Sequence, residues 1–318
     1  DTELSICKSM GLGMIGFSEA FNILKPDLIV VLGDRFEILS AVSSAMISRI
    51  PVAHIHGGEK TEGVIDEPIR HSITKMSHLH FTATNEYRNR VIQLGENPST
   101  VFNVGGLGID NINKLKLLNK NDFEKSLGFN LLEKNILITF HPVTLEVSSA
   151  KNQFQKLLDS ISKLNNTKII FTKANSDTDG RIINSMINDY VAKHDNTIAF
   201  KSMGQLKYLS ALQFMDAVVG NSSSGLLEAP SFHIGTIDIG DRQKGRIKSD
   251  SVISCLPNKN SINAAFKELY SQRFQSIVRK VENPYGKGGA SKIIVRKIRE
   301  LSLDNIIKKT FYDFKGSL

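Results

Sequence analysis

The sequence is poor in cysteine, lacks tryptophan and contains no long apolar segment. Only two of its 318 residues are cysteines, Cys7 and Cys255, which argues against a disulfide framework and favours a reducing compartment, the cytoplasm. No apolar run approaches the roughly 20 residues needed to cross a bilayer, so no membrane partner is expected. Basic residues are not interleaved with aromatic ones in a recognisable module, so no nucleic-acid partner is expected either.

The residues that are present are typical of a globular protein with two domains. Hydrophobic residues make up 41% and charged residues 23% of the chain, and its length is sufficient for two hydrophobic cores. The formal net charge is +8, with basic runs such as Arg296-Lys297 and Lys308-Lys309. Such runs usually form a solvated helix face, and attraction of phosphate groups is the sharper alternative.

Short apolar runs alternate with helical patterns along the chain. Continuous apolar runs indicate parallel strands that are buried on both faces, and the segments between them have helical periodicity. This alternation with short connections is typical of a doubly wound α/β sheet. The expected strands are 27–32, 52–55, 79–83, 101–104, 136–140, 168–172, 197–200, 217–219 and 235–239.

The alternation is interrupted by a polar segment at 111–133 that is rich in lysine and asparagine. We therefore expect two Rossmann-like domains facing a cleft, the first at 1–117 and the second at 118–289. The last amphipathic helix, within 290–318, is expected to pack back on the first domain. Because the chain opens with a helical segment where a Rossmann unit has a strand, we expect the first domain to lack its N-terminal strand.

Acidic residues follow two of the expected strands. Asp34 comes directly after strand 27–32, and Glu59 follows strand 52–55. Ligands bind at the carboxyl ends of parallel strands, where two neighbouring carboxylates would raise one pKa and suit acid–base chemistry. Asp66 adds another acid beside the same loop. The alternative is that Asp34 and Asp66 cap helices while Glu59 is a solvated loop residue.

A turn rich in glycine and serine, at 220–225, follows strand 217–219 and opens a helix. Its backbone N–H groups and the helix dipole would favour an anion such as a diphosphate. Glu228 lies about one turn further, where its carboxylate can accept hydrogen bonds from ribose hydroxyls. A plain serine N-cap is the alternative.

Histidine and arginine residues also lie at strand ends. His141 follows an expected strand, and Arg35 and Arg242 are candidate phosphate clamps, with surface salt bridges as the alternative. His54 and His56 alternate along one strand and could hold a metal ion together with Glu59. This arrangement is only a loose match to known ligand spacings, so no metal is expected.

Seven motifs, taken together, resemble those of the UDP-N-acetylglucosamine 2-epimerases, in particular the hydrolysing branch that makes N-acetylmannosamine for sialic acid synthesis. Their order and spacing cover nearly the whole chain, and their combination is highly specific. The motifs are Leu32-Gly33-Asp34-Arg35, His54-Ile55-His56-Gly57-Gly58-Glu59, Asp66-Glu67-Pro68-Ile69-Arg70-His71-Ser72-Ile73-Thr74-Lys75, Phe140-His141-Pro142, Gly220-Asn221-Ser222-Ser223-Ser224-Gly225-Leu226-Leu227-Glu228, Gly240-Asp241-Arg242-Gln243-Lys244-Gly245-Arg246 and Asn283-Pro284-Tyr285-Gly286.

The resemblance implies a GT-B-like fold, a UDP-sugar substrate held mainly by the second domain, no cofactor, and a homo-oligomer, either a dimer or a tetramer. It implies elimination of UDP to a glycal, followed by hydration that releases N-acetylmannosamine and UDP. Carried over by position, the implied catalytic residues are Asp34, Glu59, Asp66 and His141, and the implied substrate-binding residues are Arg35, His71, Asn175, Ser222, Ser223, Glu228 and Arg242.

Several alternatives to this activity remain open. The substrate could be a UDP-linked 2,4-diacetamido-trideoxyhexose, or the enzyme could be a non-hydrolysing epimerase that returns a UDP-sugar. A glycosyltransferase of the same fold and an inactive UDP-sugar-binding protein are the other candidates. Members of the family begin with a strand and an arginine-bearing loop, for which this sequence has no counterpart before Asp1.

Overall fold

The computed structural model describes residues 2–62, 64–142, 150–174 and 180–314. The chain divides into two compact units, and each is described by itself. Unit 1 comprises Asp1–Thr61, Ile65–Asp110 and Tyr285–Leu318, and unit 2 comprises Glu62–Val64 and Asn111–Pro284. The sequence predicted boundaries at 117 and 289. In the structure the units change inside helix α5 (Leu107–Lys114), after Asp110, and again between Pro284 and Tyr285.

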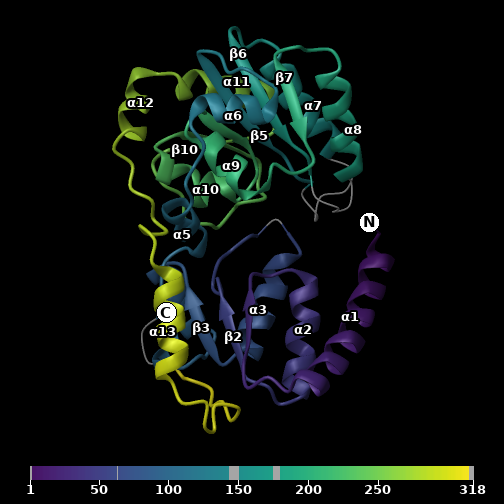
Figure 1. The fold of residues 1–318 in the computed structure, drawn as a ribbon, viewed down its shortest axis with the longest axis vertical. Coiled ribbons are helices and arrows are strands. Elements are labelled where there is room, and N and C mark those ends of the chain that lie inside the picture. Colours follow the sequence, from purple (N-terminus) through teal and green to yellow (C-terminus); the bar gives the residue numbers. More distant parts are fainter. Residues whose placement is uncertain (1, 63, 143–149, 175–179, 315–318) are drawn as a thin grey trace. The chain divides into compact units, whose positions relative to one another are not determined.

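Unit 1 is built around a parallel sheet with strand order β1-β2-β3-β4. Helices alternate with these strands, as the sequence pattern predicted, and the C-terminal helix α13 returns to this unit (Figure 1). The elements of unit 1 are α1 (Glu3–Leu24), β1 (Ile29–Leu32), α2 (Phe36–Ile47), β2 (Val52–Ile55), α3 (Asp66–Met76), β3 (Leu79–Thr82), α4 (Asn85–Gln93), a 3₁₀ turn (Pro98–Thr100), β4 (Val101–Asn103) and α13 (Ala290–Glu300).

Helices pack on both faces of the unit 1 sheet through apolar side chains. Val42 of α2 and Ile73 of α3 pack on one face, and Ala290 and Ile294 of α13 pack on the other. Strand β1 forms one edge of the sheet, and the expectation that it is buried on both faces is wrong. Val30 and Leu32, which point to the same face, are 51% and 52% exposed, whereas Val31 on the other face is buried, so one face of this edge strand is left uncovered.

Unit 2 contains a larger parallel sheet with strand order β10-β9-β8-β5-β6-β7. The strand order reverses beside β5, which lies between β6 and β8, and such a switch point is where open α/β sheets bind ligands. The elements are α6 (Lys120–Leu127), β5 (Lys134–Thr139), α7 (Ala150–Ile161), β6 (Thr167–Thr172), α8 (Gly180–Val191), β7 (Thr197–Phe200), α9 (Gly204–Leu212), β8 (Ala217–Gly220), α10 (Ser224–Leu227), a 3₁₀ turn (Ala229–Phe232), β9 (Gly235–Ile239), β10 (Val252–Cys255), α11 (Lys259–Leu269) and α12 (Gln272–Val278).

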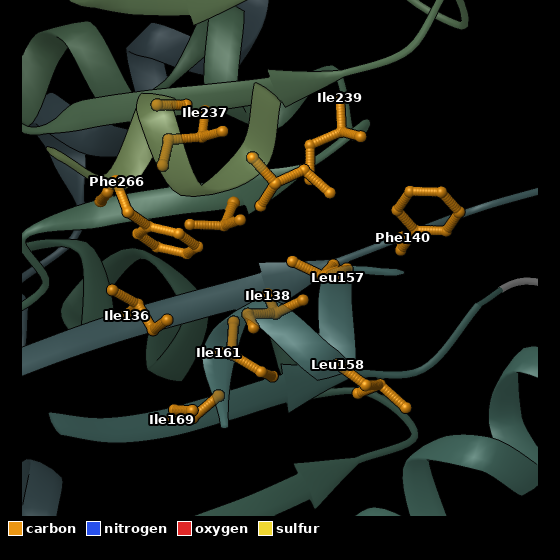
Figure 2. Packing of buried hydrophobic residues seen from close by; sticks show 14 of the residues in the cluster. Ile136, Ile138, Phe140, Leu157, Leu158, Ile161, Ile169, Ile237, Ile239 and Phe266 are labelled. Atoms are coloured by element: carbon orange, nitrogen blue, oxygen red, sulfur yellow. The ribbon is translucent and has the colours of Figure 1, made fainter. Parts of the chain in front are cut away.

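The unit 2 sheet separates two apolar clusters. One face packs against α7, α8, α11 and α12, with residues such as Ile138, Leu157 and Phe266 fully or nearly fully buried (Figure 2). The other face carries Leu137 and Val218 and packs against α6 and α9. Burial of this kind stabilises each core by roughly 1.5–3 kcal/mol for a fully buried large apolar side chain. No helix within the described ranges combines the length and the apolar character needed to span a membrane.

Candidate active site

Two of the predicted catalytic acids lie at the carboxyl edge of the unit 1 sheet. Strands β1 and β2 pair in parallel, with Leu32 opposite Ile55, so the segments that follow them leave the sheet at the same edge. Asp34 follows β1, and Glu59, whose side chain is only 3% exposed, follows β2. Asp66 is the first residue of α3, and the helix N-cap is its neighbour rather than Asp66 itself.

A fully buried arginine organises these acids. Arg70 of α3 is 0% exposed, and its Nε donates to Asp34 Oδ2 at 2.9 Å. Its Nη1 donates to Glu67 Oε2 at 2.7 Å and to the backbone carbonyl of Glu59 at 3.0 Å. Its Nη2 donates to Thr61 Oγ1 at 2.7 Å and also to Asp34 Oδ2. One guanidinium therefore fixes the positions of the segments that carry Asp34 and Glu59.

Glu67 is held ionised beside this arginine. Burial alone would raise its pKa, but hydrogen bonds from His71 and from the Thr61 N–H, together with the charge of Arg70, lower the pKa of Glu67 to about 2. The predicted substrate-binding residue His71 contacts Glu67 Oε1 through Nε2 at 3.0 Å. Its Nδ1 has no hydrogen-bond partner among the described residues. His71 therefore borders the acidic group.

The loop between β2 and the acids needs its two glycines. Gly58 has a φ of +80°, and a Cβ at this position would collide with the backbone carbonyl of Tyr87. A Cβ at Gly57 would lie 3.0 Å from both His54 Nδ1 and Thr74 Oγ1. The glycines thus allow the chain to turn tightly over α3 and α4 and deliver Glu59 into a buried position.

Unit 2 contains a cavity of about 340 Å³ at the switch point of its sheet. Residues that follow β5, β6 and β8 all contribute to its wall, as expected for a ligand site in an open α/β sheet. Lys173 and Lys201 bring positive charge suited to phosphate groups. The lining comprises Thr139, His141, Thr172, Lys173, Lys201, Ser202, Met203, Gly204, Gln205, Tyr208, Leu209, Ser222, Ser224 and Glu228.

Glu228, which lines this cavity, is linked by hydrogen bonds to two hydroxyl groups of the same lining. Ser224 Oγ donates to Glu228 Oε2 at 2.6 Å and is itself hydrogen-bonded to the Tyr208 hydroxyl. Burial raises the pKa of the Glu228 carboxyl, and the Ser224 hydrogen bond opposes this effect only in part. Burial, together with the Glu228 charge, also raises the pKa of Tyr208. Glu228 is thus a carboxyl that gains from further hydrogen-bond donors, such as sugar hydroxyls.

His141 is fixed at the same cavity by a neighbouring amide. Asn221 Oδ1 accepts from the His141 backbone N–H at 2.7 Å, and Asn221 Nδ2 donates to the His141 carbonyl at 2.8 Å. The Asn221 carbonyl in turn accepts from Arg242 Nη1 at 3.1 Å and from Gln243 Nε2 at 2.9 Å. Arg242, a predicted phosphate clamp, therefore braces the turn after β8 and is not among the residues that line the cavity.

The remaining predicted binding residues have different surroundings. Arg35 has a side chain that is 45% exposed and contacts Glu37 at 3.3 Å, outside the Arg70 contacts. Ser222 lines the cavity, whereas Ser223 is the N-cap of α10 and makes no side-chain capping bond. Asn175 lies outside the described residues. The helix that follows the predicted anion-binding turn, α10, has only four residues, so its dipole contributes little there.

The histidines considered for a metal site have separate partners. His54 is fully buried, and its Nε2 lies 2.9 Å from the Gly33 carbonyl, while burial lowers its pKa to about 3. His56 Nδ1 lies 2.8 Å from Glu59 Oε1. Within the described ranges no group of three potential ligands has the geometry of a metal site.

Three residues important to this arrangement were missed by sequence reasoning. Arg70 and Asn221 lie inside motifs quoted for the resemblance, but nothing in their spacing indicated that they hold Asp34 and His141. Tyr208 belongs to a helix pattern in which a tyrosine reads as an ordinary core residue. One signal for Arg70 was available. The helix periodicity of α3 places this charged residue on the buried face, where an arginine needs partners.

Residues 1–299 match the family described as UDP-N-acetylglucosamine 2-epimerase. The chain belongs to this family. The epimerase is 43% identical over 315 residues to the GDP/UDP-N,N'-diacetylbacillosamine 2-epimerase (hydrolyzing) of Campylobacter jejuni, covering 98% of this chain and 82% of that protein. It is 43% identical over 310 residues to the polysialic acid biosynthesis protein P7 of Escherichia coli, covering 97% and 79%. A UDP-N,N'-diacetylbacillosamine 2-epimerase (hydrolyzing) of Legionella pneumophila is 36% identical over 303 residues, covering 95% and 78%.

The fold of the epimerase also matches solved structures of the family. The crystal structure of UDP-GlcNAc 2-epimerase from Neisseria meningitidis bound to UDP-GlcNAc aligns with a TM-score of 0.81 at 22% identity, covering 93% of this chain and 82% of that chain. This likeness confirms the predicted GT-B-like class with two parallel-sheet α/β domains. By family, the chain is a UDP-sugar epimerase.

Proposed function

We propose that this epimerase is of the hydrolysing type and acts on a UDP-linked 2,4-diacetamido sugar of the diacetylbacillosamine class. Two relatives, at 43% and 36% identity, carry this activity in their names, and this observation carries the proposal. UDP-N-acetylglucosamine is the second candidate substrate, supported by the description of the family that matches residues 1–299.

The proposed reaction breaks the C1–O bond to UDP and the C2–H bond of the sugar. A carboxylate takes the C2 proton, the electron pair of that bond forms the C1–C2 double bond, and UDP leaves with the electrons of the C1–O bond. Water then adds its hydroxyl to C1, and a proton returns to C2 on the opposite face. The products are UDP and the free sugar with inverted configuration at C2.

We assign the proton transfers to the acids of unit 1. Asp34 and Glu59 lie at one sheet edge, and Asp66 opens the helix that carries Arg70. Positioned carboxylates typically contribute about 10²–10⁴-fold to such proton transfers. The buried Arg70 keeps Asp34 in one orientation, so that its carboxylate does not have to reorganise during the reaction.

We assign recognition of the nucleotide to the unit 2 cavity. Lys173, Lys201 and Ser222 line it and provide donors for a diphosphate, and Glu228 provides acceptors for ribose hydroxyls. His141, held through its backbone by Asn221, would orient the sugar or polarise the leaving group. In this proposal Arg242 stabilises the turn that carries Ser222, Ser223 is the N-cap residue of the short helix α10, and His71 borders the acids.

The test is to follow both UDP-sugars by proton NMR in deuterated water. We expect free sugar with deuterium at C2 and free UDP, and a kcat/KM for the diacetamido sugar at least about tenfold above that for UDP-N-acetylglucosamine, as one recognised polar group can provide. Glu59→Gln is the matched control, expected to bind UDP normally while losing turnover. A UDP-linked product would overturn the hydrolysing assignment, and a preference for UDP-N-acetylglucosamine would overturn the choice of sugar.

A further inference from the structure

His56 uses both of its ring nitrogens in hydrogen bonds within unit 1. Its Nδ1 lies 2.8 Å from Glu59 Oε1, and its Nε2 lies 3.2 Å from the backbone nitrogen of Leu107. A backbone N–H can only donate, so Nε2 must present a lone pair. In the neutral ring the proton is then on Nδ1, where it is donated to Glu59. This tautomer is assigned from the hydrogen-bond partners.

The backbone at His56 is in the left-handed region, which histidine enters more readily than most residues with a Cβ. His56 has a φ of +68°, in the left-handed region that residues with a Cβ adopt only at a cost in free energy. Its neighbours Gly57 and Gly58 show that this turn accommodates glycine. Residues held in sparsely populated backbone regions cluster at functional sites. The imidazole contacts with Glu59 and Leu107 are what a glycine would lack.

Leu107 belongs to a rigid part of unit 1. It is the first residue of α5, and its side chain packs against the cluster that contains Phe81 and Ile294. Asp110 in the same helix accepts hydrogen bonds from three backbone N–H groups at the start of α13, at 2.6 to 3.0 Å. The N–H that contacts His56 is therefore anchored by two helices.

We propose that His56 is a positioning residue for Glu59. The Leu107 N–H holds the His56 ring in a fixed orientation and tautomer. The inference rests on the proposed function, in which Glu59 takes part in proton transfer. Because the Leu107 N–H holds the ring at Nε2, the Nδ1–H on its other side limits the rotation of the Glu59 carboxylate. A carboxylate that is buried and cannot rotate presents the same oxygen to the substrate in every turnover.

Two substitutions at His56 separate the bond to Glu59 from the bond to Leu107. Asparagine keeps an N–H donor near the position of Nδ1 and tolerates the left-handed backbone, whereas glutamine extends toward the position of Nε2 and lacks the nearer donor. We expect His56→Asn to retain kcat within about tenfold and His56→Gln to lose about 100-fold. The KM for the UDP-sugar should stay within about twofold for both, since the nucleotide contacts are untouched.

A matched pair at Leu107 tests the backbone donor without changing the histidine. Proline is accepted at the first position of a helix and removes the N–H, whereas alanine keeps the N–H and removes the same side-chain packing. Relative to Leu107→Ala, we expect Leu107→Pro to lower kcat about tenfold at unchanged KM, with a similar urea midpoint. Nitrogen-15 NMR of the ring should show a protonated Nδ1 in the wild type.

The outcomes distinguish this inference from the proposed function. The inference is overturned if the wild type is active, His56→Gln has the kcat of His56→Asn, and Leu107→Pro has the kcat of Leu107→Ala. His56 would then be only structural. A wild-type ring protonated on Nε2 would overturn it as well, with or without turnover. A wild type that turns over neither UDP-sugar, while showing the Nδ1 tautomer, would overturn the proposed function and leave the hydrogen-bond geometry supported.

Discussion

The two edges of the unit 1 sheet carry buried charge clusters of opposite design. At the carboxyl edge, the Arg70 cluster consists of one guanidinium that is shared by Asp34 and Glu67. At the amino edge, the Glu96 cluster consists of one carboxylate that is shared by basic side chains. The members of the Glu96 cluster are Glu96, Lys75, His80 and Lys309.

The Glu96 cluster is built for attachment of the chain's C-terminal segment. Glu96 is 2% exposed, and Lys309 Nζ contacts its carboxylate at 2.7 Å while also donating to the carbonyl of Ser77 at 2.5 Å. Burial would raise the pKa of Glu96, but hydrogen bonds and charges from His80, Lys309 and Lys75 lower it to about 2. The carboxylate is thereby held ionised by three donors.

The Arg70 cluster differs because its acids outnumber its cation. Glu59 and Asp66 lie on the segments that Arg70 braces, so two carboxylates are left over for the proton transfers proposed above once the guanidinium has its partners. The two clusters therefore differ in the ratio of acidic to basic side chains and in the role that we give them. A single acid with several bases holds a segment in place, and a single base with several acids keeps reactive groups positioned.

The largest expected effect is loss of the buried guanidinium. Arg70→Met leaves Asp34 and Glu67 without their cation, and breaking a buried ion pair costs about 3–5 kcal/mol. We expect the free energy of unfolding to fall by about this amount in urea titrations, and kcat to fall at least about 100-fold where the protein is still folded. Arg70→Lys is the control, because it keeps the charge and loses the forked geometry. A folded, fully active Arg70→Met protein would contradict the role given to this cluster.

A smaller effect, confined to stability, is expected at the other edge. Glu96→Gln leaves Lys309 and Lys75 without a counter-charge, and we expect a loss of about 2–3 kcal/mol in the free energy of unfolding. At temperatures where the variant is folded, kcat/KM should stay within about twofold of the wild type. Lys309→Met is the matched change on the basic side and should cost less, since its ammonium is partly exposed. A loss of kcat in either variant without a matching loss of stability would contradict a purely structural role for the Glu96 cluster.

Sequence reasoning placed most strands of both sheets because buried parallel strands are continuous apolar runs. It missed β10, α11 and α12 in unit 2. Strand β10 reads Val-Ile-Ser-Cys, too short and too polar to stand out, and it is defined by its pairing with β9. The start of helix α5 was not predicted, because its polar residues hide a helix that is completed by contacts such as those of Asp110.

The sequence allowed the acids of the site to be predicted from their positions after β1 and β2. It did not allow the residues that hold them to be predicted. Arg70 lies three residues after Glu67 and four after Asp66 on α3, and the packing of α3 on the sheet buries its side chain. The same limit applies to Asn221, whose amide could have faced a ligand and instead brackets the backbone of His141. Residue type and spacing predict which groups reach a sheet edge, and packing decides which of them are structural.

The smallest expected effect compares the buried histidines of the two edges by pH. Burial lowers the pKa of His54, beside the Arg70 cluster, to about 3 and that of His78, beside the Glu96 cluster, to about 4. Between pH 6.5 and 4.5 the unfolded chain binds protons at these positions and the folded chain does not. Stability therefore falls as the pH falls, by up to about 1.4 kcal/mol per pH unit for each histidine. Above pH 6.5 this contribution is complete.

Substitution of one histidine from each edge isolates these contributions. His54→Gln keeps a polar group that can reach the Gly33 carbonyl and does not titrate, and we expect urea titrations from pH 6.5 to 4.5 to show a pH dependence shallower by about one histidine. His78→Gln should reduce the slope by less, because His78 is the less depressed and the more exposed of the two. Below pH 4.5 the comparison fails, since Glu67 and Glu96 also begin to protonate in the unfolded chain. Slopes equal to that of the wild type would mean that both histidines accept protons in the folded protein, and that neither edge is as well shielded from water as its burial indicates.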